Sequence, residues 1–114
     1  MADLKIDTLS IGSSIVLTLK ESLTYKNCEE MEKLFGSLTG DNKNRIIVDM
    51  QAVTFLDSKA LELLLSMNDT LSGLGGSLRL FGLNSVCRDT FIATRLINVF
   101  HIYSDMQHAL RREL

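Results

Sequence analysis

The spacing of hydrophobic and polar positions changes several times along the chain, and each change predicts a new secondary-structure element. Leu4 and Ile6 alternate with polar residues, and the apolar run SIVLTL follows at 14–19, after a Gly12-Ser13 pair. Alternating and β-branched runs that are separated by a glycine turn are typical of paired strands. The chain is therefore expected to begin with a β-hairpin.

Helical spacing begins after Asn27. The apolar positions that follow lie at i, i+3, i+4 and i+7: Met31, Leu34, Phe35 and Leu38. Asn27 and Glu30 also have the spacing of a capping box, in which two side chains satisfy free N–H groups of the first turn. A helix is therefore predicted from about Asn27 to Leu38. Its acidic residues are interpreted as a solvated face, with a docking patch for a basic partner as the alternative: Glu29, Glu30 and Glu32.

A strand and a helix are predicted in the middle of the chain. A polar break at 40–44 leads into RIIVDM at 45–50, whose continuous apolar centre suits a strand buried on both faces, as in a parallel sheet. After the loop QAVTFL, leucines at helical spacing predict a second helix from about Ser58 to Leu71. A cluster of glycines is expected to end this helix: Gly73, Gly75 and Gly76.

The last third of the chain continues the alternation of strands and helices. Three elements are predicted in this order: a strand at 77–81 (SLRLF), a helix capped by Asn84 or Ser85 that ends near Arg95, and a strand at 99–103 (VFHIY). Ser104 and Gln107 form a second capping-box match, which predicts a final helix after that strand.

The predicted order of elements is β-β-α-β-α-β-α-β-α. About five strands and about four helices that alternate through short loops predict an α/β fold, with a mixed β-sheet built from right-handed crossovers. The 114 residues suit a single domain that spans 1–114, and neither a linker nor an internal repeat divides the sequence.

Charge and composition narrow the classes of function. Twelve basic and fourteen acidic residues give a net charge of −2, and the basic residues are scattered except for Arg111 and Arg112, which argues against a nucleic-acid partner. No apolar run approaches the ~20 residues of a membrane span, and the N-terminus lacks a continuous signal-peptide core, so a cytoplasmic protein is expected. Cys28 and Cys87 lie far apart and outside any metal-ligand motif, and both are expected to be packing residues.

The sequence contains no recognisable catalytic motif. The glycines at 73–76 lead from a helix into a strand, whereas a phosphate-binding loop leads from a strand into a helix, so a helix end is favoured over a nucleotide site. The sequence displays no oriented partner for His101 or His108, and a packing or surface role is favoured for each. No enzyme activity, metal or cofactor is therefore predicted.

The strongest candidate site is the start of the second predicted helix, within VTFLDSKALELLL at 53–65. Asp57 or Ser58 could cap this helix, and capping alone is a common role for both residue types. A phosphate on Ser58 would lie near the positive end of the helix dipole and would add about −2 charge while leaving the helix intact. Charge added at a surface could repel an acidic partner or block an apolar contact, so binding could switch without unfolding.

The sequence resembles the STAS family, whose founding members are bacterial anti-sigma-factor antagonists. The likeness covers nearly the whole chain. It is most specific over RIIVDMQAVTFLDSKALELLL at 45–65, which is similar to the family's buried strand, its aspartate and the sequence around its regulated serine. The segments SLRLFGLNSVCRDTF and INVFHIYSDMQHAL match the family's later strand, helix, strand and closing helix in order and spacing.

The resemblance implies a phosphorylation switch that regulates transcription. Unmodified antagonists bind an anti-sigma factor that is also a serine kinase, and this binding frees the sigma factor. Phosphorylation of the serine that matches Ser58 ends the binding, and a serine phosphatase restores it. By the same match, Asp57 would help to shape the acceptor site, and the protein would be a kinase substrate rather than an enzyme.

Two segments differ from the family's usual pattern. Lys59 and Ala60 stand where members usually have Ser or Thr followed by Gly, and Thr24 stands where an aspartate is often used at the partner surface. Lys59 could pair with a phosphate on Ser58 or with an acidic partner. The resemblance implies a partner-binding surface made of Asp57, Ser58, Lys59, Ala60 and Thr24.

Two other classes of function remain open at this stage. In one, the protein is a STAS scaffold or a transporter-associated subunit that binds its partner constitutively, and Ser58 only caps the helix. In the other, it is an enzyme or a nucleotide-binding domain, which is less favoured because the sequence has no site motif for either.

Overall fold

The computed structural model describes residues 5–39 and 45–111 of the chain. The described elements, in chain order, are β1 (Ile6–Ile11), β2 (Ser14–Leu19), α1 (Cys28–Leu38), β3 (Arg45–Asp49), α2 (Ser58–Gly73), β4 (Ser77–Phe81), α3 (Ser85–Ala93), β5 (His101–Tyr103) and α4 (Met106–Leu110). This is the predicted order, so the predicted sequence of strands and helices is confirmed. Leu4, the polar break at 40–44 and Arg112 lie outside the described residues.

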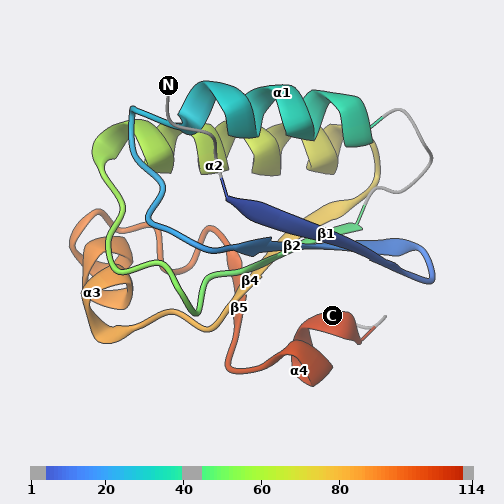
Figure 1. Ribbon diagram of the computed structural model, residues 1–114. Coiled ribbons are helices and arrows are strands. Elements are labelled where there is room, and N and C mark those ends of the chain that lie inside the picture. The colour runs from blue at the N-terminus through green and yellow to red at the C-terminus, as the bar shows by residue number, and fades with distance from the viewer. Residues whose placement is uncertain (1–4, 40–44, 112–114) are drawn as a thin grey trace.

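The five strands form one mixed sheet in the order β1-β2-β3-β4-β5. β1 and β2 are antiparallel, and β3, β4 and β5 each pair in parallel with the strand before them. Figure 1 shows α1 and α2 lying side by side over one face of the sheet, with α4 on the opposite face. The carboxyl ends of the parallel strands therefore meet at one end of the sheet, where the loops into α1, α2 and α3 begin.

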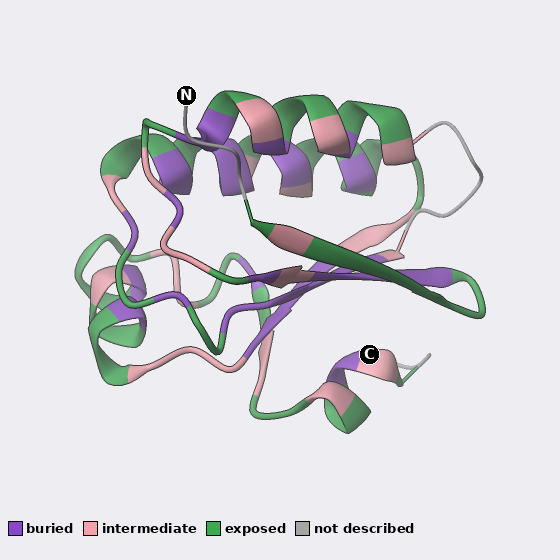
Figure 2. Cartoon of the chain, in the orientation of Figure 1, coloured by how far each residue is buried: buried purple, intermediate pink, exposed green. Residues whose placement is uncertain are grey.

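Most of the hydrophobic core lies between the sheet and the helices α1, α2 and α3. Leu17, Val48, Leu64 and Phe91 belong to this cluster and are inaccessible to solvent. β2, β3 and β4 are buried along most of their length because both faces of the sheet are covered in the middle (Figure 2). This explains the continuous apolar runs in their sequences. The edge strand β1, in contrast, is exposed apart from Ile6.

A smaller cluster lies under α4 and contains Val16, Ile47, Phe81 and Ala109. Arg79 is also buried on this side, with 1% of its surface exposed, and its Nη1 donates to the carbonyl oxygens of Ala109 at 2.7 Å and of Arg111. The guanidinium lies 5.8 Å from the ring centroid of Tyr103, and burial lowers the pKa of Arg79. Arg79 therefore holds α4, a helix of only five residues, against the sheet.

The predicted hairpin turn and the predicted end of the second helix are confirmed. Ile11 and Ser14 are paired, so the loop between β1 and β2 has two residues. Gly12 occupies the first of these positions with φ +59, a backbone conformation that glycine adopts without steric cost. α2 ends at Gly73, at the start of the glycine cluster.

The capping box predicted at Asn27 is wrong. Asn27 occupies the N-cap position of α1, but its side chain makes no hydrogen bond to the first turn of the helix. Its Oδ1 instead accepts from the N–H of Thr24 at 2.9 Å, and its Nδ2 donates to Glu21 Oε1 at 3.1 Å and to the carbonyl of Ser22 at 3.0 Å. Asn27 is only 3% exposed, because its amide holds the preceding loop together instead of capping the helix.

The caps of the last two helices also differ in detail from the prediction. Asn84, rather than Ser85, caps α3. The capping box at Ser104 is wrong by one residue, because Asp105 caps α4 by accepting from the N–H of His108 at 2.9 Å. A carboxylate at this position also places negative charge at the positive end of the helix, which a serine hydroxyl does not.

The last strand is shorter than the predicted range of 99–103. β5 begins at His101 because the residues before it form a turn, in which the N–H of Val99 donates to the carbonyl of Leu96 at 3.0 Å. Phe100 is nevertheless buried against the main core, so the apolar character of this segment reflects packing rather than strand pairing alone.

Candidate functional site

The candidate serine lies where two loops from neighbouring strands meet. The loop after β2 and the loop after β3 emerge at the same end of the sheet, because these strands are parallel. An isolated parallel bridge between Leu23 and Leu56 continues their pairing beyond the strands. The first residue of α2 follows this bridge almost at once, so the position of Ser58 depends on both loops.

Asp57 joins the start of α2 to the loop before α1. Its Oδ1 accepts from the N–H of Ala60 at 2.9 Å, which caps α2, and its Oδ2 accepts from the N–H of Tyr25 at 2.8 Å. Both carboxylate oxygens therefore bind backbone donors. The contact between Asp57 and Tyr25 spans 32 positions in sequence, and no sequence pattern predicted it.

Ser22 makes a second connection between the same two loops. Its Oγ accepts from the N–H groups of Thr54 at 3.1 Å and Phe55 at 3.2 Å, and lies 2.8 Å from Thr54 Oγ1. Two successive N–H groups that point at one oxygen hold the loop in a fixed curve. Ser22 is thus a positioning residue that the sequence analysis missed, because nothing in the local sequence indicates which loop its hydroxyl contacts.

The start of α3 makes a third connection to the loop before α2. Asn84 caps α3 through its Oδ1, and its Nδ2 donates to the carbonyl oxygens of Val53 and Thr54, both at 3.2 Å. Gly82, just before it, has φ +79, and a Cβ placed there would lie 2.5 Å from Cγ and 3.2 Å from the backbone N of Gln51. A larger residue at 82 would therefore push this loop away from its neighbour.

Ser58 itself is exposed at the first position of α2. Because Asp57 provides the cap, the Ser58 hydroxyl makes no hydrogen bond to any residue that the structure describes. The sequence left open whether Asp57 or Ser58 caps α2, and the structure shows that Asp57 is the cap.

The other three predicted site residues lie around Ser58 at different depths. Lys59 is exposed and pairs with Glu62 within α2, with Nζ 3.5 Å from Oε2. Thr24 is half-buried in the loop that Asp57 holds, next to Tyr25. Ala60 is fully buried, so its methyl group lies beneath the surface rather than on it.

Apolar side chains that are exposed to solvent flank the serine. Tyr25 is 68% exposed and Phe55 is 49% exposed, and both lie in the two loops that meet at Ser58. Exposed aromatic residues beside a fixed loop are common in protein interfaces.

In this region, burial raises the pKa of the Cys28 thiol, and Asp57 adds to that effect. Cys28 therefore remains a neutral packing residue, as predicted.

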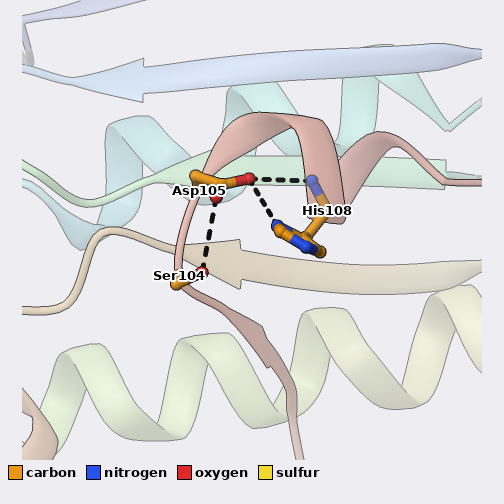
Figure 3. Close-up of polar contacts among 3 residues, drawn as sticks. All are labelled: Ser104, Asp105 and His108. Carbon is orange, nitrogen blue, oxygen red and sulfur yellow. Dashed lines mark hydrogen bonds and ion pairs between the residues drawn. The ribbon is translucent and has the colours of Figure 1, made fainter.

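The structure gives His108 an oriented partner that the sequence did not display, the carboxylate of Asp105. Figure 3 shows the Asp105 carboxylate between Ser104 and His108, with Oδ1 2.8 Å from His108 Nδ1 and Oδ2 3.5 Å from the Ser104 hydroxyl. The imidazole does not contact the hydroxyl, so it is not placed to remove the proton of Ser104. Within residues 5–39 and 45–111, no group of three or more His, Cys, Asp or Glu side chains could hold a metal ion.

The fold and the site define a small α/β domain with a preformed, exposed surface at the carboxyl ends of its parallel strands. A family model for the STAS domain matches residues 5–109, and the chain therefore belongs to the STAS domain family, as the resemblance implied. A search of curated proteins finds no match.

Solved structures share this fold at low sequence identity. TM1081 of Thermotoga maritima is 20% identical, with a TM-score of 0.87 over 92% of this chain and 91% of that one. The anti-sigma factor antagonist SpoIIAA in its unphosphorylated form is 16% identical, with a TM-score of 0.71 over 91% and 92% of the two chains.

One similar structure is part of a much larger protein. The murine anion transporter Slc26a9 is 16% identical with a TM-score of 0.75, and the match covers 90% of this chain but 18% of the transporter. No helix among the described residues is both long and apolar enough to cross a membrane.

Proposed function

We propose that this protein is a bacterial, cytoplasmic anti-sigma-factor antagonist that is controlled through Ser58. In its unmodified form it would bind an anti-sigma factor with serine kinase activity and so release the sigma factor for transcription. A phosphate on Ser58 would end the binding, and a serine phosphatase would restore it. The contact surface would consist of Ser58 with Asp57, Lys59 and Thr24, supported from below by Ala60.

The observation that carries this proposal is the free, exposed hydroxyl of Ser58 at the first position of a helix that another residue caps. A kinase can reach such a hydroxyl without opening the fold. The phosphate would lie near the positive end of the α2 dipole, so the modified helix would keep or gain stability. The modification would therefore act on binding rather than on folding.

The surroundings of Ser58 explain how a phosphate would weaken binding. A partner that packs on Tyr25 and Phe55 must remove water from this part of the surface. Covering a dianionic phosphate costs much more free energy than covering a hydroxyl, unless the partner supplies a compensating charge. Loss of affinity then follows without any change in the backbone.

The first experiment tests acceptor activity. The protein is incubated with ATP and each candidate anti-sigma factor kinase encoded in its genome, and the modified residue is located by mass spectrometry. We expect one phosphate, on Ser58, and none on the Ser58→Ala variant. A phosphate at another residue, or no phosphate with any of these kinases, would contradict the proposal.

Ser85 provides a matched control because it is also the exposed first residue of a helix that a neighbouring side chain caps. Ser85→Ala should still accept the phosphate on Ser58. In a binding assay with the same kinase, Ser58→Asp should lower affinity by about tenfold or more, which is about 1.4 kcal/mol, whereas Ser85→Asp should leave it unchanged. Equal effects of the two substitutions would show that position 58 has no special role.

A second candidate function is a constitutive STAS scaffold or transporter-associated subunit. The likeness to one part of an anion transporter supports it, because it shows this fold inside a larger membrane protein. In that case Ser58→Asp would leave partner binding intact, and the protein would be recovered with membranes that contain a transporter.

A further inference from the structure

Lys59 borders a groove between α1 and α2, directly beside Ser58. The groove has a volume of about 630 Å³ and is lined by charged residues of both helices, together with Tyr25: Glu29, Glu32, Lys33, Lys59 and Glu62. Two ion pairs of equal length lie along it. Lys59 Nζ is 3.5 Å from Glu62 Oε2, and Lys33 Nζ is 3.5 Å from Glu29 Oε1.

Both ion pairs are weakly held. The side chains of Lys59 and Glu62 are 66% and 70% exposed, and those of Lys33 and Glu29 are more exposed still. Ion pairs in full contact with water contribute little, because the solvent screens them and the flexible side chains lose entropy when they are fixed. A stronger anion within reach would therefore draw either lysine away from its present partner.

Such an anion would appear next to Lys59 if Ser58 were phosphorylated. A phosphoserine carries about −2 charge and three strong acceptor oxygens, compared with −1 on the Glu62 carboxylate. Lys59 is paired with Glu62 and not with Asp57, whose two oxygens each accept from a backbone N–H group. Lys59 follows Ser58 directly in the first turn of α2, whereas Lys33 lies on α1.

We propose that Lys59 is the receptor for a phosphate on Ser58 and leaves Glu62 when the phosphate is added. The proposal deepens the proposed function and rests on it, since it concerns the same modified serine. The groove is lined by three carboxylates and two ammonium groups, a formal balance of −1. Once Lys59 pairs with the phosphate instead, the balance of the other charged residues in the groove is −2, and Glu62 joins Glu32 as a carboxylate without an ion pair in the described part of the chain.

This exchange would extend the switch beyond the serine. The modification would change the charge of the groove between the helices as well as the charge at the helix start. A partner with an acidic segment over this groove would be repelled at two places. The position that departs from the family's usual pattern, Lys59, would thus determine which partners distinguish the two forms of this protein.

The test uses the full chain with phosphoserine incorporated at position 58 during translation, so that no kinase is needed. The pH midpoint of the second ionisation of the phosphate is measured by ³¹P NMR. A nearby cation favours the dianion, so Lys59→Ala should raise this midpoint by about 0.2–0.7 pH units, the range that an exposed ion pair provides. Glu62→Gln should lower it, because Lys59 then loses its competing partner.

Lys33→Ala is the matched control, because it removes a lysine with the same ion-pair distance from the same groove. It should leave the midpoint unchanged. Equal midpoints in the Lys59→Ala and Lys33→Ala proteins would overturn the proposal and would show that backbone N–H groups or solvent alone hold the phosphate. A failed kinase assay, in contrast, would contradict the proposed function and leave this measurement valid.

Discussion

The helices α2 and α3 begin in the same way but connect to different neighbours. Each follows a cap residue, Asp57 or Asn84, and each starts with an exposed serine. In both, one side-chain oxygen of the cap accepts from the N–H three residues later, at 2.9 Å in α2 and 2.8 Å in α3. Judged by local geometry alone, the two helix starts are equivalent.

The starts of α2 and α3 differ in what the second polar atom of the cap side chain contacts. Asp57 uses Oδ2 to accept from the N–H of Tyr25, whereas Asn84 uses Nδ2 to donate to the carbonyls of Val53 and Thr54. An acid is needed where the neighbouring loop presents a donor, and an amide is needed where it presents acceptors. The choice between Asp and Asn is therefore determined by a distant loop rather than by the helix.

The largest effect is expected from Asn84→Asp. The variant keeps an acceptor for the cap but replaces two donated hydrogen bonds with a carboxylate that faces two carbonyl oxygens. We expect the free energy of unfolding to fall by about 2–3 kcal/mol, measured by urea denaturation at neutral pH. Asn84→Ser is the control, since it keeps a capping oxygen without the repulsion and should lose less. Equal losses in the two variants would contradict the role of Nδ2.

The reciprocal change, Asp57→Asn, should cost about 1–2 kcal/mol in the same assay. The amide can cap α2 or accept from Tyr25, but its single oxygen cannot do both, and the favourable charge at the helix start is lost. Hydrogen exchange of the Tyr25 amide should become faster. If the Tyr25 amide exchanged as slowly in the variant as in the unmodified protein, the connection between the two loops would not depend on Asp57.

The ends of the same two helices offer a second comparison. After α2, the N–H of Gly75 donates to the carbonyl of Ser72 at 3.1 Å. After α3, the N–H of Arg95 donates to the carbonyl of Ile92 at 3.0 Å. Both residues have positive φ, +78 for Gly75 and +64 for Arg95, so an arginine occupies a backbone conformation that favours glycine.

Replacing Arg95 by glycine should therefore stabilise the protein. The steric cost of an L-residue in this conformation is about 1–2 kcal/mol, and the greater entropy of glycine in the unfolded chain offsets part of it, which leaves a gain of about 0.5–1 kcal/mol. The reverse change, Gly75→Ala, should cost a similar amount. Both are measured as shifts of the urea midpoint at constant slope, and a loss of stability in Arg95→Gly would contradict this explanation.

The smallest effect is expected at α4, where Asp105 is the third aspartate or asparagine cap. The hydrogen bond from the backbone N–H of His108 lowers the pKa of Asp105. The contribution of this carboxylate to stability is thus complete above the ordinary aspartate value of about 3.9, and is lost as the pH falls through the lower folded value. Asp105→Asn should therefore remove the part of the pH dependence of stability that comes from this carboxylate.

The measurement is the amide exchange of α4 between pH 2 and 5, because an exposed ion pair or carboxylate changes global stability little. The comparison with Asp57→Asn is informative, since Asp57 holds two loops and Asp105 holds only the start of a short helix. If amide exchange in α4 depended on pH in the same way in the unmodified protein and in Asp105→Asn, the Asp105 carboxylate would not be the group that stabilises the start of α4.

Local pattern was sufficient to predict the order of strands and helices and the cap of α2 at Asp57 or Ser58. It was insufficient wherever a side chain binds residues outside its own element. Asn27 has the sequence signature of a capping residue, yet it binds the preceding loop. Ser22 and Arg79 showed no local signal, although one fixes the loop before Ser58 and the other fastens α4.

The sequence alone determined the alternation of elements, since hydrophobic periodicity and glycine or cap positions act over distances of a few residues. It also determined that a serine follows an acidic residue at the start of a helix. Only the tertiary structure decided which of those two residues caps α2, and so whether the Ser58 hydroxyl takes part in the cap. The reason is physical: the partner that occupies the second oxygen of Asp57 lies 32 positions away, and only folding brings it within hydrogen-bonding distance.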